Sequence, residues 1–129
     1  MGVVSPRTEP MALEATLPWP PSVNHYWAAR GNARYLSPRA RAWREEASWR
    51  LRAARNGRGR ITREVAVFVF AYPPDRRKRD LDNILKAILD ALVHGGVLKD
   101  DWQVAEIHLI RRRPEPGGRV ELVLEEIDP

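Results

Sequence analysis

The sequence contains no cysteine among its 129 residues. This absence excludes disulfide bonds, thiolate zinc sites and a cysteine nucleophile, so any metal ion must be held by oxygen or histidine ligands. It also agrees with a reducing compartment. The histidines His25, His94 and His108 are scattered without the spacing of metal ligands, and we assign them no catalytic role.

Long apolar runs are missing as well. The longest uncharged run, residues 15–29, contains three prolines and is too short to span a bilayer. The start of the chain lacks the pattern of a secretory signal, and Pro6 stands where a myristoylation motif requires Ser or Thr. We therefore expect a cytoplasmic protein with no membrane-spanning segment.

The composition is that of a soluble globular protein, with 43% apolar and 30% charged residues, and the length fits one domain. Lys and Arg number 22 against 17 Asp and Glu, which leaves a net charge of +5. Most of the basic residues are arginines, which suit forked contacts to phosphate. A polyanionic partner is one explanation, and a solvated Arg-rich surface is the other.

The hydrophobic pattern predicts a single α/β (α+β) domain, with a mixed sheet of about four strands and two main helices in the order β-α-β-α-β-β. Residues 1–10 show no periodicity, so we expect a flexible tail ahead of a domain over 11–129. Strands are expected where β-branched and aromatic residues cluster between turn residues, over 11–17, 61–72, 102–111 and 119–127. The second strand should be central, and the last two should form a hairpin through 114–118.

The two helices are indicated by their caps and their apolar spacing. Ser37 and Pro38 supply an N-cap hydroxyl and a first-turn proline, and the Asn-Gly pair at 56–57 provides a stop. The second helix is expected over 81–93, where Leu, Ile and Val recur at helical spacing, and the glycines at 95–96 close it.

A long loop is expected over residues 22–36. It mixes polar, aromatic and basic side chains, namely Asn24, His25, Tyr26, Trp27, Arg30, Arg34 and Tyr35. Rings that stack on bases and arginines that hold phosphates suit nucleic-acid contact. The alternative is that the aromatic side chains only cover the edge of the core.

The most informative stretch, residues 73–83, follows the predicted central strand and opens the second helix. Asp80 and Asp82 lie two residues apart, so in extended or first-turn backbone both can face one point. Convergent carboxylates repel each other unless a cation lies between them, and the pair therefore predicts a divalent metal site. Two alternatives remain open. Either aspartate caps the helix, or the Asp-X-Asp holds a metal diphosphate as in nucleotide-sugar transferases.

Basic side chains surround this pair. Four consecutive ones precede it: Arg76, Arg77, Lys78 and Arg79. Two carboxylates do not need four cations, so the excess favours a phosphate ligand and metal-assisted attack of water on a phosphodiester. Lys86 lies one turn past Asp82, where it can stabilise charge on the phosphate, although an ion-pair ladder of Asp82, Lys86 and Asp90 explains the same spacing.

Asp100 and Asp101 follow the predicted glycine cap and begin a strand. From there a carboxylate can return to the start of the second helix, so the pair offers a third metal ligand. The spacing does not decide which of the two it is. Two solvated aspartates in a turn are the alternative.

Three blocks make the sequence resemble the RusA family of Holliday junction resolvases, which are small phage- and prophage-associated endonucleases. They are residues 17–24 (Leu-Pro-Trp-Pro-Pro-Ser-Val-Asn), 75–86 (Asp-Arg-Arg-Lys-Arg-Asp-Leu-Asp-Asn-Ile-Leu-Lys), and 90–92 together with 96–104. The spacing between the blocks fits, and the likeness extends from about residue 12 to 127.

This resemblance implies that Asp80, Asp82 and Asp101 are the metal ligands and that Lys86 is essential for cleavage. It implies a homodimer that depends on Mg²⁺, with Mn²⁺ as a substitute, and that nicks two opposing strands of a four-way DNA junction in recombination and repair. The expected DNA-contacting residues are Arg76, Arg77, Lys78, Arg79 and Asn83. A non-catalytic DNA-binding module, with the aspartates as helix caps, is the competing hypothesis.

Overall fold

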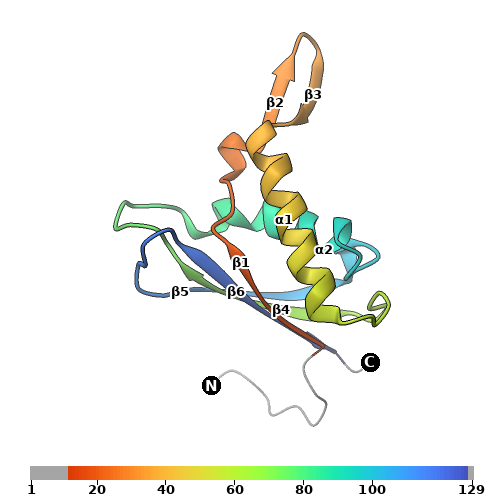
Figure 1. Ribbon diagram of the computed structural model, residues 1–129. Coiled ribbons are helices and arrows are strands. Elements are labelled where there is room, and N and C mark those ends of the chain that lie inside the picture. Colours follow the sequence, from red (N-terminus) through yellow and green to blue (C-terminus); the bar gives the residue numbers. More distant parts are fainter. Residues whose placement is uncertain (1–11, 128–129) are drawn as a thin grey trace.

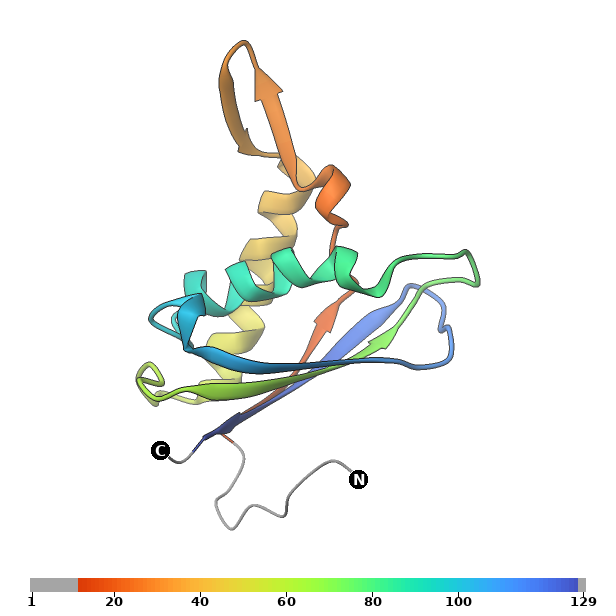
Figure 2. The same ribbon diagram turned by 180° about the vertical axis from the view of Figure 1, so that it is seen from behind.

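The computed structural model describes residues 12–127, and the predicted tail over 1–10 lies outside them. Four strands form one mixed sheet in the order β1-β6-β4-β5. They are β1 (Leu13–Pro18), β4 (Val65–Tyr72), β5 (Val104–Arg111) and β6 (Arg119–Glu126). Figures 1 and 2 show the two helices, α1 (Pro38–Arg55) and α2 (Leu85–His94), on the same side of this sheet. The predicted fold class, a single mixed α/β domain, is confirmed.

Strand β4 is central, as predicted, because it pairs with β6 on one side and β5 on the other. Its alternate residues Val65, Val67, Val69 and Ala71 are fully buried in the core. The period-two pattern thus gives the sheet one face against the helices. None of the helices within residues 12–127 is long and apolar enough to cross a membrane.

The predicted hairpin between the last two strands is wrong. β5 runs parallel to β4, β6 runs antiparallel to it, and β4 therefore lies between them. The connection crosses the end of β4, where Arg112 N–H donates to Ala71 O and Glu115 N–H donates to Pro73 O, both at 2.8 Å. Turn residues alone do not distinguish a tight hairpin from a link that crosses one strand, because neighbouring strands are only about 5 Å apart.

The helix caps are confirmed. Ser37 Oγ accepts a hydrogen bond from Ala40 N–H at 3.1 Å, and Asn56 ends α1 in the left-handed conformation with a φ of 52°. Gly96 follows α2 with a φ of +78°, a conformation that favours glycine. The second helix differs at its start, because residues Leu81–Ile84 form a 3-10 turn, η2, before α2 begins.

The expected loop over 22–36 is instead a short 3-10 turn, η1 (Val23–His25), followed by an antiparallel hairpin of β2 (Trp27–Arg30) and β3 (Ala33–Leu36). The hairpin projects away from the sheet in Figure 1. It was missed because almost all its side chains are exposed, so the strands lack the apolar alternation that marks a half-buried strand.

Three strand starts also differ from the prediction. β4 begins at Val65, and Ile61 makes only an isolated bridge to Leu98. Residues Asp101–Gln103 form a 3-10 turn, η3, ahead of β5. β1 begins at Leu13, while residue 11 lies outside the described part of the chain.

Candidate active site

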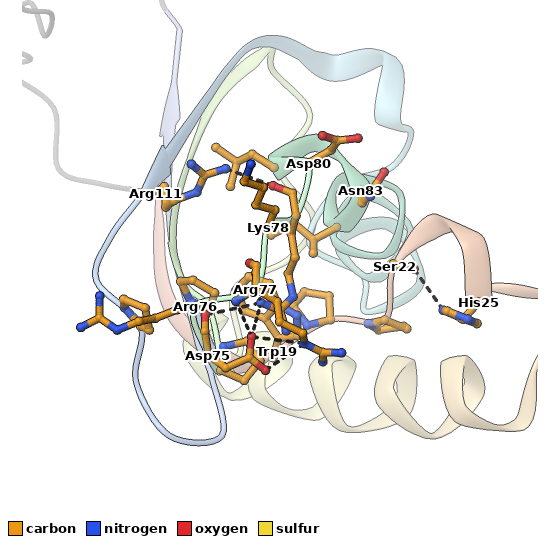
Figure 3. Close-up of a pocket in the computed structure, with 18 of the residues that line it drawn as sticks. Trp19, Ser22, His25, Asp75, Arg76, Arg77, Lys78, Asp80, Asn83 and Arg111 are labelled. Atoms are coloured by element: carbon orange, nitrogen blue, oxygen red, sulfur yellow. Dashed lines mark hydrogen bonds and ion pairs between the residues drawn. The ribbon is translucent and has the colours of Figure 1, made fainter.

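A pocket of about 1010 Å³ lies at the carboxyl end of β4, where residues 73–80 lead into η2. Figure 3 shows Asp75, Arg76 and Arg77 on one side of it and Asp80 with Asn83 on the other. The basic side chains that line it are Arg39, Arg76, Arg77, Lys78, Arg79, Arg111 and Arg112. Only two carboxylates, Asp75 and Asp80, accompany them, so the pocket is suited to an anion.

Within the basic run, two arginines are already paired. Asp75 Oδ1 accepts hydrogen bonds from Arg77 N–H at 2.9 Å and from Arg79 Nη1 at 2.8 Å, and Arg77 Nε lies 3.3 Å from Asp75 Oδ2. The bond from Arg79, followed by that from the Arg77 backbone, holds the pKa of Asp75 well below its usual range. Arg76 and Lys78 are exposed and have no ion-pair partner among residues 12–127. Asp75 therefore accounts for part of the excess positive charge that we assigned to a phosphate ligand.

Asp80 and Asp82 are not used as helix caps. Asp80 occupies the N-cap position of η2, but its side chain makes no capping hydrogen bond. Asp82 lies in the first turn. Both are exposed, and within residues 12–127 neither carboxylate has a hydrogen-bond or ion-pair partner. The capping interpretation of this pair is therefore wrong, and both carboxylates remain available to a ligand.

The ladder interpretation of Lys86 is also wrong. Asp90, its expected partner one turn on, instead accepts a hydrogen bond from the buried Tyr26 hydroxyl and lies 3.3 Å from Arg44 Nη1. Burial and the bond to Asp90 raise the pKa of Tyr26 above its ordinary value. Lys86 is exposed and has no ion pair in the described part of the chain.

The structure separates the roles of the two adjacent aspartates before β5. Asp100 Oδ1 accepts a hydrogen bond from Trp102 N–H at 2.9 Å, and Gln103 Oε1 accepts one from Asp100 N–H at 2.9 Å, which together form a capping box on η3. The backbone bond from Trp102, followed by a bond with Asp101, lowers the pKa of Asp100. Asp100 thus serves as the cap of η3, whereas Asp101 lies exposed in its first turn and is not the capping residue.

The predicted ligands do not converge as their side chains stand. Asp80 lines the basic pocket, Lys86 and Asp101 line a smaller pocket of about 230 Å³, and Asp82 lines neither. Within residues 12–127, no group of three or more Asp, Glu or His side chains lies close enough to hold a metal ion. The donor chemistry nevertheless fits a hard divalent cation, because all three side chains are exposed carboxylates, which supply the oxygen ligands that such ions prefer.

Comparison with known protein families matches residues 18–125 to Endodeoxyribonuclease RusA. The chain belongs to the RusA family. Among curated relatives, the crossover junction endodeoxyribonuclease of Enterobacteria phage HK97 is 39% identical over 112 residues, which are 87% of this chain and 92% of the phage protein. Proteins of the same name from Shigella sonnei strain Ss046 and Escherichia coli strain K12 are each 36% identical over the same shares.

Membership of the RusA family confirms the resemblance and the class of enzyme, an endodeoxyribonuclease. The match includes all the predicted metal ligands, the basic run and Lys86.

Part of the basic pocket was not predicted from the sequence. Arg39 lines it from α1, and Arg111 and Arg112 line it from the end of β5. Arg111 Nη2 also donates to Arg79 O at 3.1 Å, which ties the two basic segments together. The available signal was the run of three arginines at 111–113, since parallel β4 and β5 bring their carboxyl ends to the same edge of the sheet.

Proposed function

We propose that this RusA-family chain resolves four-way DNA junctions in recombination and repair, by hydrolysing phosphodiester bonds with a divalent cation. The observation that carries the proposal is the uncommitted state of Asp80 and Asp82, which adjoin a strongly basic pocket in a chain whose relatives are crossover junction endodeoxyribonucleases. A bound cation would draw these carboxylates together, because without one they repel each other.

Asp80, Asp82 and Asp101 would hold the cation, Mg²⁺ or, in its place, Mn²⁺, because both take carboxylate and water oxygens. When bound, the cation supplies Lewis acidity for the attack of water on the phosphodiester. Lys86 is free of ion pairs in the described chain, so its ammonium can stabilise the negative charge that builds on the phosphate.

The basic pocket supplies the DNA-binding surface of the proposal. Arg76 and Lys78 are exposed and available to phosphates, whereas Asp75 holds Arg77 and Arg79 in fixed positions along the same wall. The remaining predicted DNA contact, Asn83, lines the same pocket. Together these side chains would place a DNA strand beside η2.

We further propose that the protein acts as a homodimer in the cytoplasm. A four-way junction has two-fold symmetry, and two matched nicks on it require two matched active sites. A symmetric dimer of this chain would supply them.

Incubation of a synthetic four-way junction with and without Mg²⁺ tests the function, with a linear duplex of the same sequence as the control. We expect paired nicks in opposing strands of the junction, only with Mg²⁺, and little cutting of the duplex. Binding of the junction without metal-dependent nicking would instead support the non-catalytic DNA-binding module. Binding of a sugar nucleotide in place of DNA would support the alternative that the Asp-X-Asp motif belongs to a nucleotide-sugar transferase.

A further inference from the structure

Trp102 is the most exposed of the large hydrophobic side chains within residues 12–127, with 76% of its surface accessible. Single exposed apolar residues are common on protein surfaces, so exposure alone indicates no function. The position of Trp102 is what distinguishes it, because it directly follows Asp101, a proposed metal ligand.

The backbone beneath the Trp102 ring is held firmly. Its N–H donates to Asp100 Oδ1 at 2.9 Å. The next residue, Gln103, is buried and accepts from Lys99 N–H at 2.7 Å while donating to Ile61 O at 2.7 Å. An indole ring on a rigid turn loses little conformational entropy when it binds, so this turn presents the ring as a preorganised contact.

The surroundings of Trp102 suit a nucleotide. Lys86 and Lys99 line the pocket of about 230 Å³ together with Asp90, Asp100 and Asp101, and Trp102 follows this lining directly in the chain. Asp90 is paired with Arg44, and Asp100 caps η3. With the proposed cation on Asp101, the two ammonium groups would favour a DNA phosphate there, and a phosphate at that place would bring its base near the neighbouring ring. Stacking of bases on aromatic rings needs no particular base, because every base has a π-face.

The indole of Trp102 has no ring or cation contact with the described residues. Trp49 on α1 provides a comparison, since it is 70% exposed but has the Arg52 guanidinium 6.0 Å from its ring centre. Neither tryptophan lines either of the two pockets, and Trp49 lies on α1 rather than next to Asp101 in the chain.

We propose that Trp102 stacks on a base whose face is uncovered at the branch point of the DNA junction. The inference rests on the proposed function and adds a basis for its specificity. In a continuous duplex each base is covered on both faces by its neighbours, whereas in the open form of a four-way junction the stack is interrupted at the exchange point. A stacking ring next to Asp101 would therefore favour branched over linear DNA.

The test compares Trp102→Ala, Trp102→Phe and the matched control Trp49→Ala, with far-UV circular dichroism to check folding. Each protein is titrated with a four-way junction that carries the fluorescent base 2-aminopurine at the crossover, and with a linear duplex. We expect Trp102→Ala to bind the junction about 5- to 150-fold more weakly, the range for loss of one stacked base, and to bind the duplex normally. Trp102→Phe should keep most of the affinity, Trp49→Ala should match the parent, and quenching of 2-aminopurine should disappear in Trp102→Ala.

Unchanged junction binding by Trp102→Ala would overturn the proposal, as would an equal loss for junction and duplex. If Trp102→Ala were monomeric in analytical ultracentrifugation while the parent is a dimer, the proposal would also be overturned, because Trp102 would then lie in a contact between subunits. Cleavage of the junction by the parent protein is measured in the same series. If the parent cleaves with Mg²⁺ and Trp102→Ala behaves identically, only the stacking proposal fails. If the parent does not cleave, the proposed function fails first.

Discussion

Substitution of Asp82 by asparagine should reduce cleavage of a four-way junction by more than about a hundredfold, because loss of even an indirect metal contact typically costs 10- to 100-fold. Binding of the junction should persist, since the change removes one negative charge from a basic surface. The measurement is single-turnover cleavage of a labelled junction with saturating protein and Mg²⁺, paired with a gel-shift titration without the metal.

The matched control for this substitution is Glu14→Gln. Glu14 is exposed on β1, lines neither pocket and has no ion-pair partner in the described residues, so its variant removes the same charge outside the site. Cleavage by Glu14→Gln should equal that of the parent. Parent-like cleavage by Asp82→Asn would remove Asp82 from the mechanism.

Substitution of Gln103 by leucine should lower the free energy of unfolding by about 2–4 kcal/mol, because each buried polar group left without a partner costs about 1–3 kcal/mol. Gln103 is 6% exposed and accepts from Lys99 N–H and Asp100 N–H. Its amide also donates to Ile61 O at 2.7 Å and Arg63 O at 3.0 Å. Leucine keeps the bulk of the side chain but provides none of these bonds, and urea unfolding followed by fluorescence measures the loss.

The neighbouring Glu106→Gln is the control, because Glu106 is exposed on β5 and, among residues 12–127, its only ion-pair partner is the His108 side chain at 3.1 Å. Its substitution should change stability by less than about 0.5 kcal/mol. A Gln103→Leu protein as stable as the parent would mean that the loop before β5 does not depend on this amide. We also expect the folded Gln103→Leu protein to cleave the junction more slowly than the parent, because the same loop carries Asp101.

Local features of the fold were predictable from the sequence, because each depends on a few adjacent residues. Ser37 and Pro38 mark the start of α1, and the apolar residues of β4 mark a central strand. The order of the strands was not predictable in the same way. It depends on pairing between distant segments, so the turn residues at 114–118 were misread as a hairpin.

For the candidate site, residue types were predictable but partners were not. Asp80, Asp82 and Lys86 were identified from their spacing. Only the structure shows that Asp90 accepts a hydrogen bond from the hydroxyl of Tyr26, which is 64 residues away in the sequence. In the same way, a capping box on η3 distinguishes Asp100 from Asp101. Its two partners, Asp100 and Gln103, are only three residues apart, but the box forms only in a 3-10 turn, which the sequence pattern did not indicate. Contacts made by long-range packing and the exact backbone of short turns could therefore not be predicted from the sequence.

The central claim is that Asp80, Asp82 and Asp101 share a divalent cation, and anomalous X-ray diffraction from crystals soaked in Mn²⁺ tests it most directly. We expect an anomalous peak within coordination distance of all three carboxylates, with Asp82 turned toward the other two, and loss of that peak in Asp82→Asn crystals. A peak held by other residues, or none at a Mn²⁺ concentration that supports cleavage, would contradict the account.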